Sequence, residues 1–330
     1  MMPAAPAPGG SRRLFRRLTA TTAAVTFLLI VAGGVVRVTG SGEGCGVPGQ
    51  NWPLCNGHLV PLPDVPTLIE FSHRVLAFLA TLLMVATLVL AWGRHRSERR
   101  IVVAATVGSA LLVVQILLGF VVVETGLLSG TILVHLANAE LLLGVLVYLA
   151  YVARVAGTER ERRALAPRPV RRLLWAAAAA VYLLVLSGAL VVDTASSTGC
   201  LGWPLCGNGL QLPAGGAGDL NMLHRVVAGV VALFVGFAMG LVLSRTTDRG
   251  VRVAAMLVNL LLVAQIAAGA VMVDTGFETA VRSSHEALAS AFWALTLLVA
   301  VLGHRTALKA PAPRAVVSEP RGAAAGTSSA

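Results

Sequence analysis

The chain has 330 residues, of which 56% are hydrophobic and only 12% are charged. A chain of this length would ordinarily form about two soluble domains, but so few charged residues cannot cover a water-facing surface. The composition therefore excludes the soluble enzyme folds and indicates a membrane protein.

Eight apolar segments follow one another along the chain, each near the length of about 20 residues that crosses a bilayer core. They occupy residues 19–39, 68–92, 101–123, 131–153, 172–193, 221–243, 251–273 and 282–303. The first follows a basic stretch as a signal peptide would, but its apolar run is too long for one. The sequence therefore predicts an all-α polytopic membrane protein with eight transmembrane helices.

Basic residues are distributed unevenly between the two sides of these segments. Of the 26 Lys and Arg, 22 lie in the N-terminal segment, in the loops 93–100, 154–172 and 244–252, and in the C-terminal tail. The positive-inside rule then places both termini in the cytoplasm, with the protein in the cell membrane. Anionic lipid accounts for the net charge of +11, and no nucleic-acid partner is predicted.

Several motifs recur at a spacing of 150 or 151 residues. The recurring elements are Trp52–Cys55 with Trp203–Cys206, His73 and Arg74 with His224 and Arg225, Gln115 with Gln265, and His135 with His285. The sequence thus predicts two tandem four-helix bundles, 19–153 and 172–303, in one orientation because four is even. A cytoplasmic N-terminal segment 1–18, a basic cytoplasmic linker 154–171 and a disordered cytoplasmic tail 304–330 complete the chain.

Four of the seven histidines lie at similar depth near the outer ends of the even-numbered spans: His73, His135, His224 and His285. One such histidine could simply bond to a neighbouring helix, but polar side chains at this depth are costly and usually functional. Two imidazoles from facing helices can ligate a haem iron from both sides. Zinc or copper would want further ligands, and none recurs beside both pairs.

Only four basic residues lie at the outer half of the membrane: Arg37, Arg74, Arg225 and Arg282. Two of them directly follow histidines of the set, and Arg282 precedes His285 by one helical turn. Because guanidinium binds carboxylate bidentately, we expect these arginines to contact haem propionates. Anchoring to lipid headgroups is the alternative.

All four cysteines fall in outer loops, where an oxidising compartment and short spacing favour the disulfides Cys45–Cys55 and Cys200–Cys206. Pairs of reactive thiols that deliver electrons are the competing interpretation.

The two halves differ at one chemically important position, since Glu70 in the first half is matched by Asn221 in the second. Glu70 lies one turn before His73, on the same helix face. It could stabilise a positive charge or take a proton at one haem, or it could only pair with Arg74.

Together, the Glu-x-x-His-Arg motif at 70–74, the four histidines, the paired loop cysteines, the Trp-Pro-Leu-Cys motifs and the duplication resemble the haem A synthase family over residues 15–305. The resemblance implies that haem O is oxidised to haem A by two hydroxylations of a methyl group, with water as the oxygen source. It implies that Glu70 is catalytic, that His73 and His135 ligate haem O, and that His224 and His285 ligate a haem b cofactor.

The resemblance also implies partners: haem O synthase, oxidase assembly factors, an electron acceptor that the sequence does not identify, and a possible second copy of the chain. Two other classes compete with the enzyme. A di-haem b, quinol-linked electron carrier would need a haem near the inner face, which the histidines do not provide. A non-catalytic haem chaperone or transporter would not need the difference between Glu70 and Asn221.

Overall fold

The computed structural model describes residues 8–46, 54–61, 64–208 and 210–306. Within these ranges the chain is helical apart from its connections, and extended pairing is confined to the isolated bridges Cys55–His58 and Cys206–Gln211. In chain order the helices are α1 (Pro8–Val38), α2 (Val65–Arg94), α3 (Arg99–Glu124), α4 (Thr131–Val155), α5 (Glu159–Arg162), α6 (Arg168–Asp193), the 3₁₀ turn η1 (Ser197–Gly199), α7 (Ala217–Arg245), α8 (Arg249–Asp274) and α9 (Thr279–Gly303).

Eight helices of the described chain, α1–α4 and α6–α9, are long and apolar enough to cross a membrane. This confirms the predicted all-α class and the eight spans. Four-residue α5 lies in the predicted linker, and the predicted disorder of the tail concerns residues that, beyond 306, lie outside the described ranges.

Helix α1 begins at Pro8, well before the predicted start of the first span at residue 19. Arg12 Nη1 donates to the backbone oxygen of Ala156 at 3.3 Å, which ties the basic stretch to the end of α4. Phe15 is buried and stacks on His95, with ring centroids 4.3 Å apart. These contacts stabilise the basic stretch as part of the helix, so the predicted N-terminal segment is helical from Pro8 onward.

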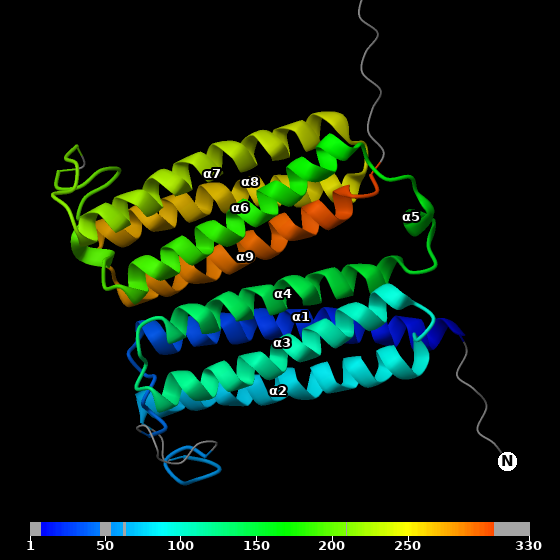
Figure 1. The fold of residues 1–330 in the computed structure, drawn as a ribbon, viewed down its shortest axis with the longest axis horizontal. Coiled ribbons are helices and arrows are strands. Elements are labelled where there is room, and N and C mark those ends of the chain that lie inside the picture. The colour runs from blue at the N-terminus through cyan, green and yellow to red at the C-terminus, as the bar shows by residue number, and fades with distance from the viewer. Residues whose placement is uncertain (1–7, 47–53, 62–63, 209, 307–330) are drawn as a thin grey trace, which may run out of the picture.

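The membrane helices form two groups (Figure 1). In the first, α1 and α3 each pack on both α2 and α4; in the second, α6 and α8 each pack on both α7 and α9. Helices α2 and α4 are therefore diagonal partners across one bundle, as α7 and α9 are across the other. The groups meet where α1 and α4 pack on α9 and α4 packs on α6. The duplication itself stays a prediction from the sequence repeat.

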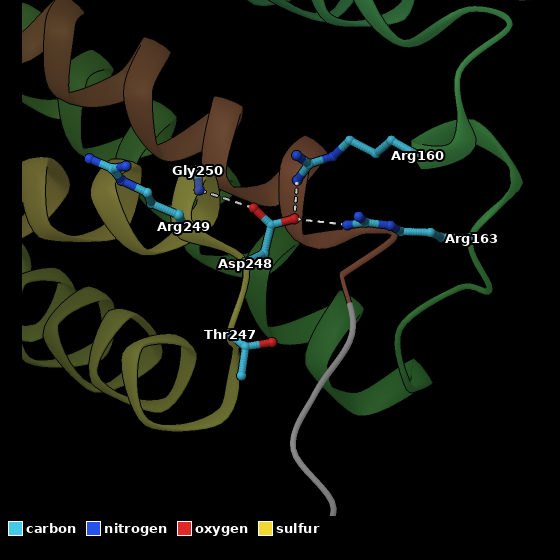
Figure 2. Close-up of a pocket in the computed structure, with 6 residues that line it drawn as sticks. All are labelled: Arg160, Arg163, Thr247, Asp248, Arg249 and Gly250. Carbon is cyan, nitrogen blue, oxygen red and sulfur yellow. Dashed lines mark hydrogen bonds and ion pairs between the residues drawn. The ribbon is translucent and has the colours of Figure 1, made fainter.

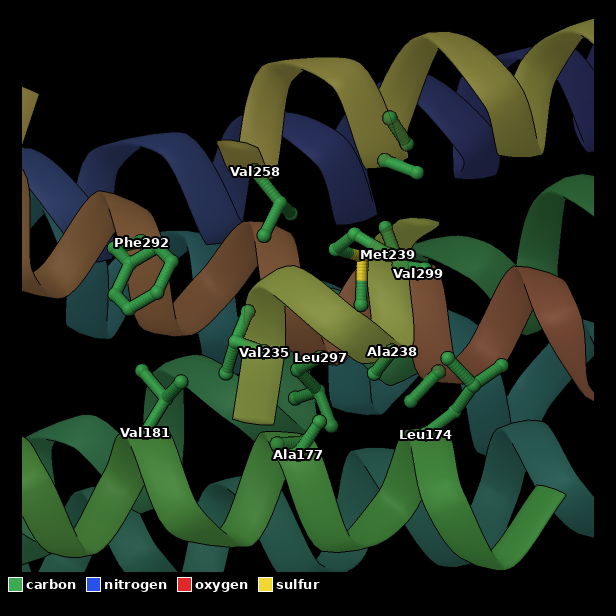
Figure 3. Packing of buried hydrophobic residues seen from close by; sticks show 14 of the residues in the cluster. Leu174, Ala177, Val181, Val235, Ala238, Met239, Val258, Phe292, Leu297 and Val299 are labelled. Atoms are coloured by element: carbon green, nitrogen blue, oxygen red, sulfur yellow. The ribbon is translucent and has the colours of Figure 1, made fainter. Parts of the chain in front are cut away.

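The core of the second group shows how the helices pack. Leu174, Ala177 and Val181 lie at helical spacing on α6 and face Val235, Ala238 and Met239 of α7, all nearly inaccessible (Figure 3). Such i, i+3, i+7 spacing makes one apolar face. Because lipid tails are as apolar as these side chains, close packing through small residues holds such helices together.

The two ends of the bundles differ in chemistry. One end carries the cysteine loops and is called the cysteine end; the other carries α5 and the α2–α3 and α7–α8 connections and is called the basic end. At the cysteine end Asp64 caps α2 by accepting from Thr67 N at 3.3 Å. Hydrogen bonds from Thr67 lower the pKa of the Asp64 carboxyl.

Candidate functional site

The four predicted histidines form two facing pairs at the cysteine end. His73 on α2 and His135 on α4 are close enough to interact electrostatically, and so are His224 on α7 and His285 on α9. Each pair joins diagonal helices of one bundle. The sequence predicted such a pairing for two ligands of one iron, and the ligation itself stays a prediction.

Each histidine ring packs against a glycine of a neighbouring helix. The distances from a Cβ added at the glycine to the ring Cε1 are 3.0 Å for Gly33 and His73, 3.2 Å for Gly119 and His135, 3.0 Å for Gly188 and His224, and 3.2 Å for Gly269 and His285. A side chain at any of these positions would press on the ring. The glycines therefore let the helices approach while leaving the imidazoles at the bundle centre.

A glutamine orients one histidine in each pair. Gln115 Nε2 lies 3.1 Å from His135 Nε2, and Gln265 Nε2 lies 3.2 Å from His285 Nε2. In the first group Asn138 Nδ2 donates to Gln115 Oε1 at 2.7 Å and fixes that amide. The equivalent of Asn138 in the second group is Leu288, and Gln265 Oε1 is buried without a partner there.

A serine distinguishes the other two histidines. Ser187 Oγ lies 2.8 Å from His224 Nδ1 and 2.7 Å from Leu184 O. The hydroxyl has one hydrogen, which Leu184 O accepts, so Ser187 accepts from the Nδ1–H of His224 and leaves Nε2 free as a ligand. No serine faces His73. Ala32 precedes Gly33, the glycine that contacts His73, just as Ser187 precedes Gly188, the glycine that contacts His224. His73 Nδ1 is buried without a hydrogen bond.

Glu70 is buried on α2 and both of its carboxylate oxygens are occupied. Oε1 accepts from Arg74 Nη2 at 2.6 Å and from Arg74 Nε at 3.1 Å, while Oε2 accepts from Cys45 N at 2.8 Å. The ion pair that the sequence offered as an alternative to catalysis is therefore present. It holds the carboxylate in one orientation, one turn from His73.

The matching arginine of the second group has different partners. Arg225 Nε donates to Asn221 Oδ1 at 2.9 Å, and Nη2 donates to Cys200 O at 2.7 Å. Its Nη1 donates to Gly202 O at 2.7 Å, and Arg74 Nη1 likewise donates to Leu54 O at 2.7 Å. Both arginines thus fasten a cysteine loop to a helix, a role that the propionate prediction did not include.

The other two outer arginines also differ from one another. Arg37 of α1 forms an ion pair with Glu286 of α9 at 2.5 Å, and so links the two groups beside His285. Among the described residues the guanidinium of Arg282 has no hydrogen-bond or ion-pair partner, although its backbone N donates to Glu278 O, so its side chain is the one best able to meet a propionate. The propionate contacts of all four arginines stay predictions.

The cysteines pair as predicted. Disulfides join Cys45 to Cys55 and Cys200 to Cys206, and all four side chains are buried. Each disulfide closes the loop that precedes a histidine helix, so it supports the end of the bundle where the histidines lie.

Two acids on the seam between the groups, half-buried Glu286 and buried Glu140, were missed by the sequence analysis. Glu286 directly follows His285, and Glu140 of α4 is fully inaccessible, with Oε1 at 2.5 Å from the hydroxyl of Ser290. Both interrupt apolar spans, which was the available signal. Their matching positions, Leu136 and Ser290, carry no charge.

The residues present fit a bis-histidine haem in each group. Within the described ranges no three His, Cys, Asp or Glu side chains gather as a metal cluster, so each site offers two imidazoles, the axial set of a haem iron whose remaining ligands come from the porphyrin. His73 Nδ1 and His285 Nδ1 are buried without hydrogen-bond partners. Because buried polar atoms normally have a partner, these two nitrogens are consistent with a bound group that is not part of the chain.

Comparison with known proteins agrees with this chemistry. A family model described as cytochrome oxidase assembly protein (COX15-CtaA) matches residues 16–67 and 64–297. Proteins named heme A synthase from Bacillus cereus (strain 03BB102), Bacillus anthracis and Bacillus thuringiensis subsp. konkukian (strain 97-27) are each 26% identical over 302 residues. Each alignment covers 91% of this chain and 96% of the relative.

Proposed function

The chain belongs to the haem A synthase family of cytochrome oxidase assembly proteins, and on that premise we propose that it oxidises the methyl group of haem O to the formyl group of haem A. The observation that carries the proposal is the pairing of four histidines at one end of two bundles, with Glu70 one turn before His73 where neutral Asn221 stands one turn before His224. Two equal carrier sites would not need that difference.

His224 and His285 are proposed to hold a resident haem b, and His73 and His135 to hold the substrate haem O. The serine supports this division, because Ser187 bonds Nδ1 of His224 whereas Nδ1 of His73 has no hydrogen-bond partner. A permanent ligand gains affinity from such a fixed ring. A substrate must also leave, so a ligand whose Nδ1 is not held by a side chain suits the other site.

The proposed oxidation proceeds in two balanced steps and a dehydration. The methyl carbon and one water give a hydroxymethyl group, two protons and two electrons; a second water gives the geminal diol with the same release, and loss of water leaves the formyl group. Bound haem b supplies a one-electron acceptor close to the substrate. The electrons then pass to an acceptor outside this chain.

Glu70 is proposed to stabilise the positive charge that develops on the methyl carbon. Arg74 and the Cys45 amide hold its carboxylate in place, and a preorganised charge acts without reorganisation at the moment of reaction. Neutral Asn221 in the second group would leave haem b chemically unaltered.

The cellular setting follows from the same proposal. The protein would receive haem O from a haem O synthase and pass haem A to oxidase assembly factors. It would lie in the cell membrane with both termini in the cytoplasm. The excess of basic residues at the basic end supports that orientation.

Pigment extraction from the purified protein tests the proposed function. Haem A or its hydroxymethyl intermediate beside haem b is expected after expression with a haem O synthase. Haem b alone, in an amount matching both sites, would instead support the electron carrier. Unaltered haem O beside haem b, with no oxidised product under any acceptor, would support the chaperone.

A further inference from the structure

A cavity of about 560 Å³ lies at the basic end, far along the helices from the histidines, and the proposed function leaves it unused. It is lined by Arg160 of α5 and Arg163 just after it, and by Thr247, Asp248, Arg249 and Gly250 around the start of α8 (Figure 2). From this cavity we propose a binding site for the phosphate of an anionic membrane phospholipid.

One carboxylate positions the two arginines of the cavity. Asp248 Oδ2 lies 3.2 Å from Arg160 Nη2 and 3.0 Å from Arg163 Nη1, as the dashed lines of Figure 2 show. Its other oxygen caps α8 by accepting from Gly250 N and Val251 N. The helix end is thus already satisfied, and the arginines are what remains to bind an anion.

Both guanidinium groups keep donors after this pairing. A guanidinium has five N–H donors in a planar fork that matches phosphate oxygens. Arg160 Nε is buried without a partner, and Arg163, half exposed, gives only Nη1 to Asp248 within the described residues. Two positive charges face one negative charge here, so an incoming phosphate meets net attraction and unused donors.

Further arginines raise the positive charge around the cavity. Arg305 Nη1 donates to Arg163 O at 2.7 Å, and Arg249 extends from the rim away from Asp248. Two acids lie on α5, Glu159 and Glu161, and Glu161 accepts from Gly157 N at 2.9 Å. Their two negative charges are outnumbered by Arg162, Arg249 and Arg305, so the surroundings still favour an anion.

The surface below the cavity favours a lipid over free phosphate. From Gly250 along α8, Val253, Leu257 and Leu260 follow at helical spacing and are 42%, 45% and 63% exposed. At 1.5 Å per residue this apolar strip runs about 15 Å into the membrane layer, parallel to acyl chains. A headgroup phosphate on the arginines would place its chains on the strip, whereas inorganic phosphate would gain nothing from it.

Phospholipid retention on the purified protein tests the site. Native mass spectrometry is carried out after transfer from nanodiscs of phosphatidylcholine with phosphatidylglycerol, and bound lipid is counted. Arg163→Gln and Arg160→Gln are each expected to lower phosphatidylglycerol retention about tenfold. Arg154→Gln, which removes an exposed arginine outside the cavity, is the matched control and should retain it.

A second measurement separates lipid from free phosphate and guards against misfolded variants. Thermal unfolding of the wild-type protein should shift upward with phosphatidylglycerol in the nanodisc and stay unchanged with inorganic phosphate in detergent. Arg163→Lys keeps the charge and should keep part of the shift. An equal shift with inorganic phosphate overturns the lipid assignment. Equal phosphatidylglycerol retention in wild type and both glutamine variants overturns the site itself.

Discussion

Helices α2 and α7, which carry the matching histidines His73 and His224, make similar contacts and differ in one charge. In α2, Arg74 meets the carboxylate of Glu70; in α7, Arg225 meets the neutral amide of Asn221 and turns its other donors to loop carbonyls. Both arginines anchor a disulfide-closed loop. The shared contact therefore belongs to the architecture of each bundle, and the carboxylate is the added element.

A second difference runs in the opposite direction. Ser187 bonds Nδ1 of His224, whereas Ala32 at the matching position leaves Nδ1 of His73 without a hydrogen bond. The first group thus has Glu70 where the second has neutral Asn221, and the second has Ser187 beside its histidine where the first has Ala32. This teaches that a duplicated scaffold can separate reaction from cofactor retention by very few substitutions at the histidine helices.

The largest expected effect comes from removing the charge that only α2 carries. Glu70→Gln keeps size and most hydrogen bonding, so haem binding should survive while haem A formed per bound haem falls about 100-fold or more. Asn221→Asp is the reciprocal control and should leave that ratio near wild type. An undiminished ratio in Glu70→Gln would leave Glu70 as only the partner of Arg74.

The next largest effect is expected from removing one histidine ligand, and it should differ between the two groups. His224→Ala or His285→Ala is expected to remove the low-spin haem b spectrum of the purified protein, because one axial ligand is lost. His73→Ala and His135→Ala should retain that spectrum and lose substrate haem. A normal haem b signal in His224→Ala would contradict the assignment of the second pair.

Ser187→Ala should give an intermediate effect. Without the acceptor for its Nδ1–H, His224 no longer holds one tautomer, and haem b affinity should fall about tenfold. The measurement is the rate of haem transfer to an excess of apomyoglobin. Ala32→Ser in the first group is the matched variant, and it should slow the release of haem from the His73 pair if the serine acts as described.

The disulfides should behave alike in the two groups. Without reductant, mass spectrometry after alkylation is expected to find Cys45 and Cys55 blocked together and Cys200 and Cys206 blocked together. Readily alkylated thiols in one loop only would reveal a redox role confined to that group and extend the asymmetry to the loops.

The smallest effect concerns the N-terminal caps of α2 and α7. Asp64 caps α2, whereas α7 begins after Gly216 without a side-chain cap. Since folding lowers the pKa of Asp64, its stabilisation is present above the unfolded value near 4 and is lost as pH falls through the folded value. Asp64→Ala should lower Tm by about 2 °C at pH 7, and the gap from wild type should narrow progressively as pH is lowered below about 4. A gap that does not vary with pH would contradict a charged cap.

Much of the fold was predictable because each level of the sequence gave the same result. An apolar segment long enough to cross the bilayer must be a helix unless it belongs to a closed barrel, because only these structures satisfy the backbone hydrogen bonds in lipid. The helix α1 was predicted too short because composition alone registers Arg12 and Arg16 as solvent-facing. Only the structure brings their guanidinium groups to carbonyls at the end of α4.

The histidines of the candidate site were predictable from depth and spacing, but the residues that orient them were not. Gln115 and Gln265 recur with the same spacing as the histidines, yet a repeat does not say which side chains touch. Ser187 and Ala32 were less visible still, because neither residue type is unusual in a membrane helix. Contacts between helices far apart in sequence decide these roles.

The buried contact between Glu140 and Ser290 has a consequence for how the chain could be divided. The 150-residue repeat makes these two positions equivalent, and they meet each other across the seam. Two copies of the first half would bring carboxyl against carboxyl there, and two copies of the second would bring serine against serine. A hydroxyl donates a charge-assisted hydrogen bond to a carboxylate, whereas two carboxylates repel one another and two hydroxyls form only a weaker neutral hydrogen bond. The seam thus selects the unlike half, so separately expressed halves should assemble with each other in preference to themselves.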